Sequence, residues 1–250
     1  MMLGVLTGNE IARYQRQISI FGRNGQKKLK RARVFVAGVG GLGSAVLSYL
    51  VAAGIGSIRV VDNDIVELSN LNRQILHWDS DLGREKVASA KEKLSKMNAN
   101  VELEAISATI DKDNVEELVA DYDMIVDAMD NFSTRYVLNR AALSRKIPYF
   151  HGAVQGFYGQ VTTIIPGRTA CLRCIFPEAP PPVMPAVVGV TPGVIGCLQA
   201  DEVIKYILGM GELLENRLMI WDGLKVEMDE IPLEKNPHCS DCGVELAYEG

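Results

Sequence analysis

The stretch "RVFVAGVGGLGSAV", residues 33–46, joins a buried-strand pattern to a glycine-rich turn and the start of an apolar helix. Gly38, Gly40 and Gly43 have the spacing G-x-G-x-x-G. Glycine allows a tight turn here and lets backbone N–H groups approach a phosphate, where the helix dipole also favours negative charge. Alone the spacing is a weak signal, but between a strand and a helix it predicts a nucleotide-binding loop.

Strand and helix patterns alternate beyond this loop. Helices are expected near 42–53, 84–97, 113–120 and 133–145, and strands at 57–62, 101–106 and 124–129. Such alternation predicts a parallel sheet with right-handed crossovers. We therefore predict an α/β fold with a Rossmann-like, mostly parallel sheet and flanking helices.

The remaining segments predict additions to this sheet. Before the sheet we expect a helix at 9–22 and a basic patch at 27–33. After it we expect strands at 147–153 and 159–167, a proline-rich irregular crossing at 171–194, a helix at 196–208 and a two-strand pattern across 217–231. We expect one domain over residues 1–250. It would comprise an N-terminal helix and arm to about residue 30, a nucleotide-binding half at about 31–150 and a second half at about 151–250.

Composition excludes some partners. The chain of 250 residues is 48% hydrophobic and 23% charged, with a formal net charge of −5. It therefore has no overall cationic field for nucleic acid or an anionic membrane. Two uncharged runs, 34–58 and 179–200, contain the glycines and prolines expected to interrupt a membrane-spanning helix. With no secretory pattern at the N-terminus, we expect a cytoplasmic protein that binds neither membrane nor nucleic acid.

Charged side chains distinguish the possible nucleotides. Asp62 ends a strand 24 positions after Gly38, a plausible distance for a carboxylate on a ribose hydroxyl, whereas Asp64 could be a cap or a supporting group. NAD, FAD and ATP all fit these features. Arg73 and Lys86 favour a triphosphate, because nucleophilic attack on phosphorus needs fixed positive charge nearby.

Asp130 and Asn131 follow the strand at 124–129, at the sheet edge where open α/β sheets bind ligands. A carboxylate beside a triphosphate needs a cation between them, so Asp130 is predicted to bind Mg²⁺. In the alternative interpretation Asp130 only caps the next helix, a role also open to Asn131 or Ser133.

Six motifs occur in one order along nearly the whole chain: "RYQRQ", "GVGGLGS", "VDNDIVELSNLNRQ", "GREK", "DAMDNFSTR" and a pair of C-x-x-C sequences. In this the chain resembles the MoeB/ThiF/HesA family, the bacterial and archaeal relatives of ubiquitin-activating enzymes. The resemblance implies a homodimer that uses ATP and Mg²⁺ to adenylate the C-terminal glycine carboxylate of a small ubiquitin-like carrier protein ending in Gly-Gly. Residues 151–250 would then be the carrier-binding half.

The resemblance also implies roles for single residues. Gly41 and Asp62 would contact the nucleotide, Lys86 the phosphate in the transition state, and Asp130 the magnesium ion. Arg16 would reach the phosphates of the partner subunit. The polar cluster that would line the phosphate site comprises Ser69, Asn70, Asn72, Arg73 and Gln74.

Four cysteines predict a metal site. Cys171 and Cys174 form one C-x-x-C pair and Cys239 and Cys242 form another, with 64 residues between the two pairs. Two such pairs can complete a tetrahedral Cys₄ site, and in a reducing compartment structural Zn²⁺ is favoured over disulfides or thiol chemistry. A closed site of this kind would fasten the C-terminal tail to the fold.

The fifth cysteine, Cys197, is expected on the core face of a helix. Many members of the family have another cysteine in the crossing, but residues 177–192 contain none. This difference favours a protein that stops at the acyl-adenylate, with no covalent cysteine step. We also expect the apolar stretch 180–187 to guide the carrier tail, and the histidines at 77, 151 and 238 to be packing or surface residues.

Two other functions remain open from the sequence. A NAD- or FAD-dependent oxidoreductase explains the glycines and Asp62, but gives Arg73, Lys86 and Asp130 no joint task. A catalytically silent, zinc-stabilised scaffold predicts loss of some charge from the nucleotide site, yet the expected charged positions are all present.

Overall fold

The computed structural model describes residues 5–181 and 186–243. Within them the strands are β1 (Arg33–Ala37), β2 (Ser57–Val61), β3 (Glu102–Ile106), β4 (Met124–Asp127), β5 (Tyr149–Gln155), β6 (Tyr158–Ile164), β7 (Arg217–Asp222) and β8 (Glu227–Pro232). They form one sheet in the order β3-β2-β1-β4-β5-β6-β7-β8. Strands β3 to β5 are parallel, and β5 to β8 are antiparallel, so the predicted mixed sheet is confirmed.

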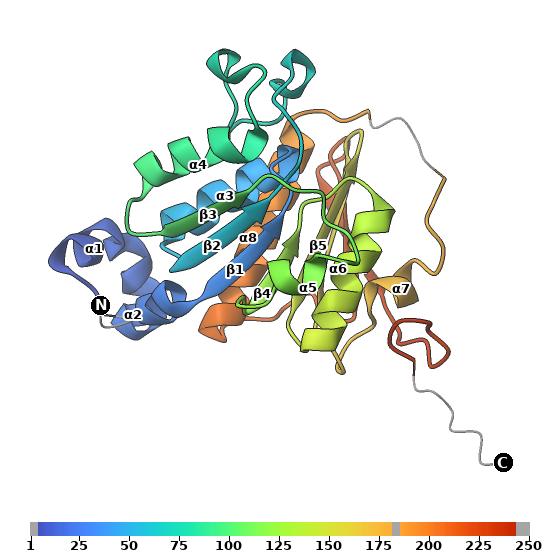
Figure 1. Cartoon of the computed structure of the whole chain (residues 1–250). Helices are drawn as coiled ribbons and strands as arrows, with labels where there is room; N and C mark the ends of the chain where they lie inside the picture. The colour runs from blue at the N-terminus through green and yellow to red at the C-terminus, as the bar shows by residue number, and fades with distance from the viewer. Residues whose placement is uncertain (1–4, 182–185, 244–250) are drawn as a thin grey trace.

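Helices cover both faces of the sheet (Figure 1). They are α1 (Gly8–Arg13), α2 (Gln15–Arg31), α3 (Gly41–Ala53), α4 (Lys86–Met97), α5 (Val115–Leu118), α6 (Phe132–Arg145), α7 (Leu172–Ile175) and α8 (Val190–Leu208), with 3-10 turns η1 (Leu68–Asn70) and η2 (Asp79–Asp81). Helices α2, α3, α4 and α8 share one core with Val34 and Val36 of β1. Phe35 and Ala37 point to the other face, into the core of α5, α6 and α7. Burial on both faces explains why the strand is apolar from Val34 to Ala37.

Helices α3 and α8 lie on the same face of the sheet and approach each other closely. A Cβ atom on Gly196 of α8 would lie 2.7 Å from the carbonyl oxygen of Leu42. Glycine at this position therefore brings α8 against the first turns of α3. The start of α8 in turn reaches the glycine-rich loop, because Pro192 lies over Gly41.

Two predicted helix boundaries were wrong. The basic patch at 27–33 belongs mostly to α2, which continues to Arg31 with a kink at Gly22. Helix α8 begins at Val190, inside the stretch expected to be irregular, because Pro192 lies in its first turn, where a missing N–H costs nothing. The two halves predicted to meet near residue 150 share one sheet, since β5 spans that position.

None of the helices in the described parts of the chain is both long and apolar enough to cross a membrane.

Candidate active site

The site lies where the direction of the strand order changes. Strand β1 has β2 on one side and β4 on the other, and ligands of open α/β sheets bind at the carboxyl edge of such a point. The glycine-rich loop follows β1, residues 62–85 follow β2, and residues 128–131 follow β4. In Figure 1 the segment 62–85, in cyan and teal, stands above this edge.

Glycine is required at two positions of the loop. Gly38 has φ +97°, and a Cβ atom there would lie 2.7 Å from the carbonyl oxygen of Ala128. A Cβ atom on Gly43 would lie 2.1 Å from the carbonyl oxygen of Gly38. Gly40 is the N-cap of α3, so the first backbone N–H groups of the helix have no intrahelical partner and no capping side chain in front of them. The loop is thus built for close approach of an anion.

Asp62 shapes this loop as well as facing it. One carboxylate oxygen accepts a hydrogen bond of 2.8 Å from the N–H of Val39, and the other accepts one of 2.8 Å from the N–H of Asp64. Burial raises the pKa of Asp62, and these two bonds and the charge of Lys86 offset part of the rise. The predicted contact of Asp62 with a ribose would be a second role beside this structural one.

Lys86 begins α4 and points to the same edge. Its ammonium group lies 2.7 Å from a carboxylate oxygen of Asp64, and its N–H donates to the Asp64 carbonyl oxygen over 3.0 Å. Asp64 is therefore the ion-pair partner of Lys86, not a helix cap.

The side chain of Arg73 hydrogen-bonds to two other members of the polar cluster, Ser69 and Asn72. Arg73 donates to the Ser69 carbonyl oxygen over 2.9 Å and to the side-chain oxygen of Asn72 over 3.1 Å. Its aliphatic stem lies beside Gly41, 3.6 Å from where a Cβ atom would be. The two bonds fix the guanidinium group against the turn at residues 69–72.

Asn70 and Gln74 are the buried members of the cluster. The side-chain oxygen of Asn70 accepts from the N–H of Glu67 over 3.0 Å, so Asn70 stabilises the turn that presents Arg73. Gln74 reaches to 3.8 Å from the Cβ position of Gly40. Its side-chain oxygen is buried without a partner among the described residues, which leaves an acceptor at the site.

Asn131, not Asp130, caps α6. The side-chain oxygen of Asn131 accepts from the N–H of Thr134 over 2.9 Å. Asp130 is exposed and makes no hydrogen bond or ion pair within the described residues. The alternative role of Asp130 as a cap is therefore wrong, and its carboxylate is free for a cation.

Asp127 and Arg135 hold the backbone just before Asp130. Asp127 accepts from the N–H of Met129 over 3.0 Å, and Arg135 donates to the Met129 carbonyl oxygen over 2.6 Å. Burial alone would raise the pKa of Asp127, but Arg135 and His151 lower it. Neither residue was among the predicted site residues, because their partner is a backbone group that no sequence spacing reveals.

Arg16 is the one predicted site residue that does not join this edge. It is exposed on α2, two positions after Tyr14, which packs on Gly54 at the far end of α3. Helix α3 has 13 residues, so Arg16 lies roughly 20 Å from the glycine-rich loop of its own chain.

The four predicted metal ligands meet beside α7. The sulfur atoms of Cys171, Cys174, Cys239 and Cys242 all lie within 4.8 Å of one another. Three of the separations are 3.4, 3.6 and 3.8 Å, close to the roughly 3.8 Å that tetrahedral Zn–S bonds require. Asn139 joins the two cysteine pairs, since its amide accepts from Leu172 N–H over 2.9 Å and donates to Asp241 over 2.8 Å. The cluster fits a zinc ion.

The remaining cysteine and histidines lie elsewhere. Cys197 is half-buried beside Tyr49 of α3, and burial raises the pKa of its thiol. His77 and His151 are buried and hydrogen-bonded, whereas His238 is exposed. A half-buried thiol of raised pKa is a poor nucleophile.

Known proteins resemble this chain in sequence and in fold. The model of the ThiF family matches residues 14–241. The chain belongs to the ThiF family. It is 44% identical over 246 residues to the SAMP-activating enzyme E1 of Haloferax volcanii, covering 95% of this chain and 91% of the relative. It is 42% identical over 252 residues to the sulfur carrier protein adenylyltransferase of Thermus thermophilus, covering 96% and 93%. The crystal structure of E. coli MccB with ATP superimposes with a TM-score of 0.83 at 27% identity, covering 92% of this chain and 73% of MccB.

Proposed function

We propose that this ThiF-family protein is an adenylyltransferase that uses ATP to activate the C-terminal carboxylate of a small ubiquitin-like carrier protein. The observation that supports it best is that Arg73 lies beside Gly41 of the glycine-rich loop, while Lys86 and Asp130 follow β2 and β4, the strands that flank β1, at the same edge of the sheet. The name of the Thermus relative, sulfur carrier protein adenylyltransferase, supports the substrate class.

In the proposed reaction a carboxylate oxygen of the carrier attacks the α-phosphorus of ATP, and the bond to the pyrophosphate oxygen breaks. Two anions must approach each other, and charge then builds on the departing pyrophosphate. Lys86 and Arg73 supply positive charge at these points. The carboxylate is already ionised at neutral pH, so no general base is needed.

The metals have separate roles in this proposal. Asp130 would hold Mg²⁺, which would neutralise part of the charge on the phosphates. The four cysteines would hold a structural Zn²⁺ ion that joins α7 to the C-terminal segment. We place the protein in the cytoplasm, where four thiols gathered in this way stay reduced.

We further propose a homodimer in which Arg16 completes the site of the partner subunit. Two features support it. Arg16 lies far from the loop of its own chain, as described above. The segment that contains Arg73 also exposes five large apolar side chains: Ile65, Leu68, Ile75, Trp78 and Leu82. So many exposed apolar side chains in one segment favour an interaction with a partner.

The proposed carrier-binding half includes the crossing after α7. Residues 177–181 are exposed, and residues 186–188 pair with Gly156 at the turn between β5 and β6. The start of α8 then packs against Asn72 and Gly41. The crossing thus leads from the antiparallel strands to the nucleotide loop, a suitable path for the tail of a carrier, although residues 182–185 lie outside the described parts.

We propose that the reaction ends at the acyl-adenylate. Residues 177–192 contain no cysteine, and Cys197 is half-buried in the middle of α8. An oxidoreductase would have no joint task for Arg73, Lys86 and Asp130. The silent scaffold is disfavoured because none of the expected charges has been lost.

The test is carrier-dependent exchange of labelled pyrophosphate into ATP, with small proteins from the same source that end in Gly-Gly. We expect exchange with at least one of them. No exchange with any carrier, from protein that binds ATP, would support the silent scaffold instead.

A further inference from the structure

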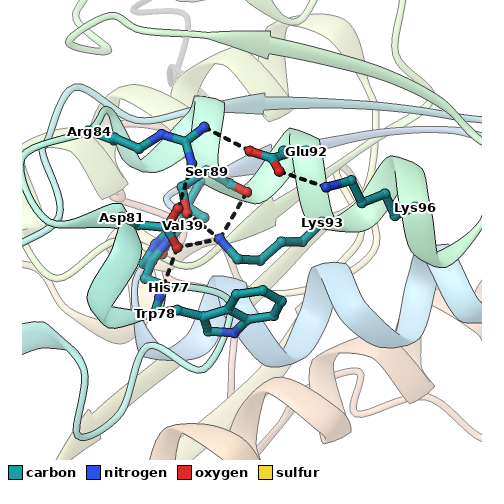
Figure 2. Close-up of polar contacts among 9 residues, drawn as sticks. All are labelled: Val39, His77, Trp78, Asp81, Arg84, Ser89, Glu92, Lys93 and Lys96. Atoms are coloured by element: carbon teal, nitrogen blue, oxygen red, sulfur yellow. Dashed lines mark hydrogen bonds and ion pairs between the residues drawn. The ribbon is translucent and has the colours of Figure 1, made fainter.

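His77 lies between the glycine-rich loop and α4 and is almost completely buried, with 3% of its surface exposed (Figure 2). Its Nε2 atom lies 3.1 Å from the carbonyl oxygen of Val39, and its Nδ1 atom lies 2.9 Å from the hydroxyl oxygen of Ser89. His77 therefore connects a helix that starts with Lys86 to the loop that would hold the phosphates.

The direction of these hydrogen bonds follows from Lys93. An ammonium group can only donate, and that of Lys93 donates to the Ser89 hydroxyl oxygen over 2.8 Å. The Ser89 hydroxyl is then free to donate to Nδ1 of His77, and the Val39 carbonyl can only accept. The neutral imidazole with its proton on Nε2 satisfies both neighbours. Asp81 and the ring of Trp78, 4.6 Å away, hold Lys93 in place.

Val39 is held at both of its backbone groups. Its N–H donates to Asp62 and its carbonyl oxygen accepts from His77. In a planar trans peptide the carbonyl group of Val39 and the N–H of Gly40 point in opposite directions. Because His77 holds the carbonyl on the protein side, the N–H of Gly40 faces outward. Among the described residues this N–H has no acceptor.

We infer that His77 is a positioning residue for nucleotide binding: it fixes the Val39–Gly40 peptide so that the N–H of Gly40 is presented to a phosphate of ATP. The inference rests on the proposed function, because it needs the loop to bind ATP. Ser89 and Lys93 support His77 by fixing its tautomer.

This arrangement makes ATP binding sensitive to acid. The charged groups that face His77 are Lys86 and Lys93 of α4 and Asp81 of η2. Burial and the two lysines lower the pKa of His77, and the Val39 carbonyl and Asp81 offset part of the shift. His77 is therefore neutral at pH 7. As the pH falls, protonation of Nδ1 breaks the hydrogen bond that this atom accepts from the Ser89 hydroxyl. The resulting imidazolium lies beside the ammonium groups of Lys86 and Lys93, and their repulsion loosens the loop.

The experiment measures the Kd of ATP between pH 5 and pH 8 for the wild type and two variants, with urea unfolding as a check of folding. His77→Leu removes the donor to Val39, so Kd should rise about tenfold at pH 7. In His77→Gln the side-chain amide can donate from nearly the same place. Its Kd at pH 7 should stay within roughly threefold of the wild type. Its binding should also weaken less in acid than that of the wild type.

Two lysines of α4 provide a matched pair. Lys93→Met removes a charge that lowers the pKa of His77, so binding should weaken at a higher pH than in the wild type. Lys96, whose side chain is exposed and bonded to Glu92, serves as the control, because Lys96→Met should leave the pH dependence unchanged.

The outcomes separate this inference from the proposed function. A folded His77→Leu protein with the Kd of the wild type, or an unchanged acid dependence in His77→Gln, would overturn the positioning role while the wild type still binds ATP. Wild-type protein that binds no ATP would overturn the proposed function, and this inference with it.

Discussion

The ion pair between Lys86 and Asp64 joins side chains of very different exposure, 6% for Lys86 and 60% for Asp64. Lys86 has lost most of its contact with water, whereas Asp64 remains hydrated. Asp64 thus supplies the counter-charge that keeps a nearly buried ammonium group stable at the ligand-binding edge. The phosphates of ATP would offer a second anion to the same group.

Lys86→Met should therefore affect chemistry far more than stability. Pyrophosphate exchange is expected to fall by about 10²- to 10³-fold, because a charge aimed at the transition state is lost. The midpoint of urea unfolding should stay nearly unchanged, since the abandoned Asp64 carboxylate is solvated. Lys91→Met, at an exposed position of the same helix, is the control. Exchange within twofold of the wild type would remove Lys86 from the mechanism.

Asp130 and Asn131 are adjacent, but substituting Asp130 should lower activity, whereas substituting Asn131 should lower stability. Asp130→Asn is expected to leave unfolding unchanged and to lower exchange at least tenfold, with a higher Mg²⁺ concentration needed for half-maximal rate. Asn131→Ala removes the N-cap of α6 and should cost about 1 kcal/mol of unfolding free energy. Exchange titrated with Mg²⁺, beside urea unfolding, distinguishes the two. If both variants behaved alike, Asp130 would not be the cation ligand.

The order of strands and helices in the nucleotide-binding half was predictable, because each element has its own apolar pattern. The antiparallel strands and the Cys₄ cluster were also predicted correctly. The start of α8 was not, since Pro192 and a run without charge suggest an irregular chain. Pro192 is tolerated in the first turn of α8, and contact with Gly41 and Asn72 holds the start of the helix in place. Tertiary packing, which the local sequence does not show, therefore helps to set this boundary.

At the site, charged side chains that follow strands were easier to predict than the groups that hold them. Lys86 and Asp130 stand at predicted strand and helix ends. His77 and Arg135 bond to backbone carbonyl oxygens of other loops, and His77 reaches across 38 positions to Val39. Nothing in the sequence around His77 indicates that partner. It was predicted to be a packing or surface residue, and its burial agrees with packing, although its hydrogen bonds suggest more.

The proposed dimer predicts a specific complementation. Arg16→Ala and Arg73→Ala should each lower exchange by at least tenfold. In a mixed dimer of the two, the subunit with intact Arg73 receives intact Arg16 from its partner, so one of the two sites is complete.

After unfolding and refolding an equal mixture, half of the dimers are mixed, and about one quarter of wild-type activity should return. A refolded mixture no more active than its separate components would show that Arg16 does not act across an interface. Refolded wild type sets the reference for recovery.

The cysteine cluster predicts one zinc ion per chain. Cys174→Ser should lose zinc in elemental analysis and lower the unfolding temperature by several degrees, because the segment around Cys239 loses its link to α7. Cys197→Ser is the control and should keep the full zinc content. Zinc retained by Cys174→Ser would contradict the four-ligand site, as would a disulfide found in the freshly purified protein.

Asp81 should make stability depend on pH in the acid range. Burial alone would raise the pKa of its carboxyl group, but hydrogen bonds from Lys93 and from the N–H of Trp78 lower it to about 2. A carboxyl group with a lowered pKa stabilises the folded state fully above its unfolded pKa near 4, and this stabilisation is lost as the pH falls toward 2.

Asp81→Asn should therefore cost about 2 kcal/mol at pH 6, measured by urea unfolding, and the difference from the wild type should shrink steadily below pH 4. Glu92→Gln, which changes an exposed carboxylate bonded to Arg84, should leave the free energy of unfolding nearly unchanged at either pH. A difference between wild type and Asp81→Asn that stayed constant from pH 6 to pH 3 would mean that Asp81 acts through shape and not through charge.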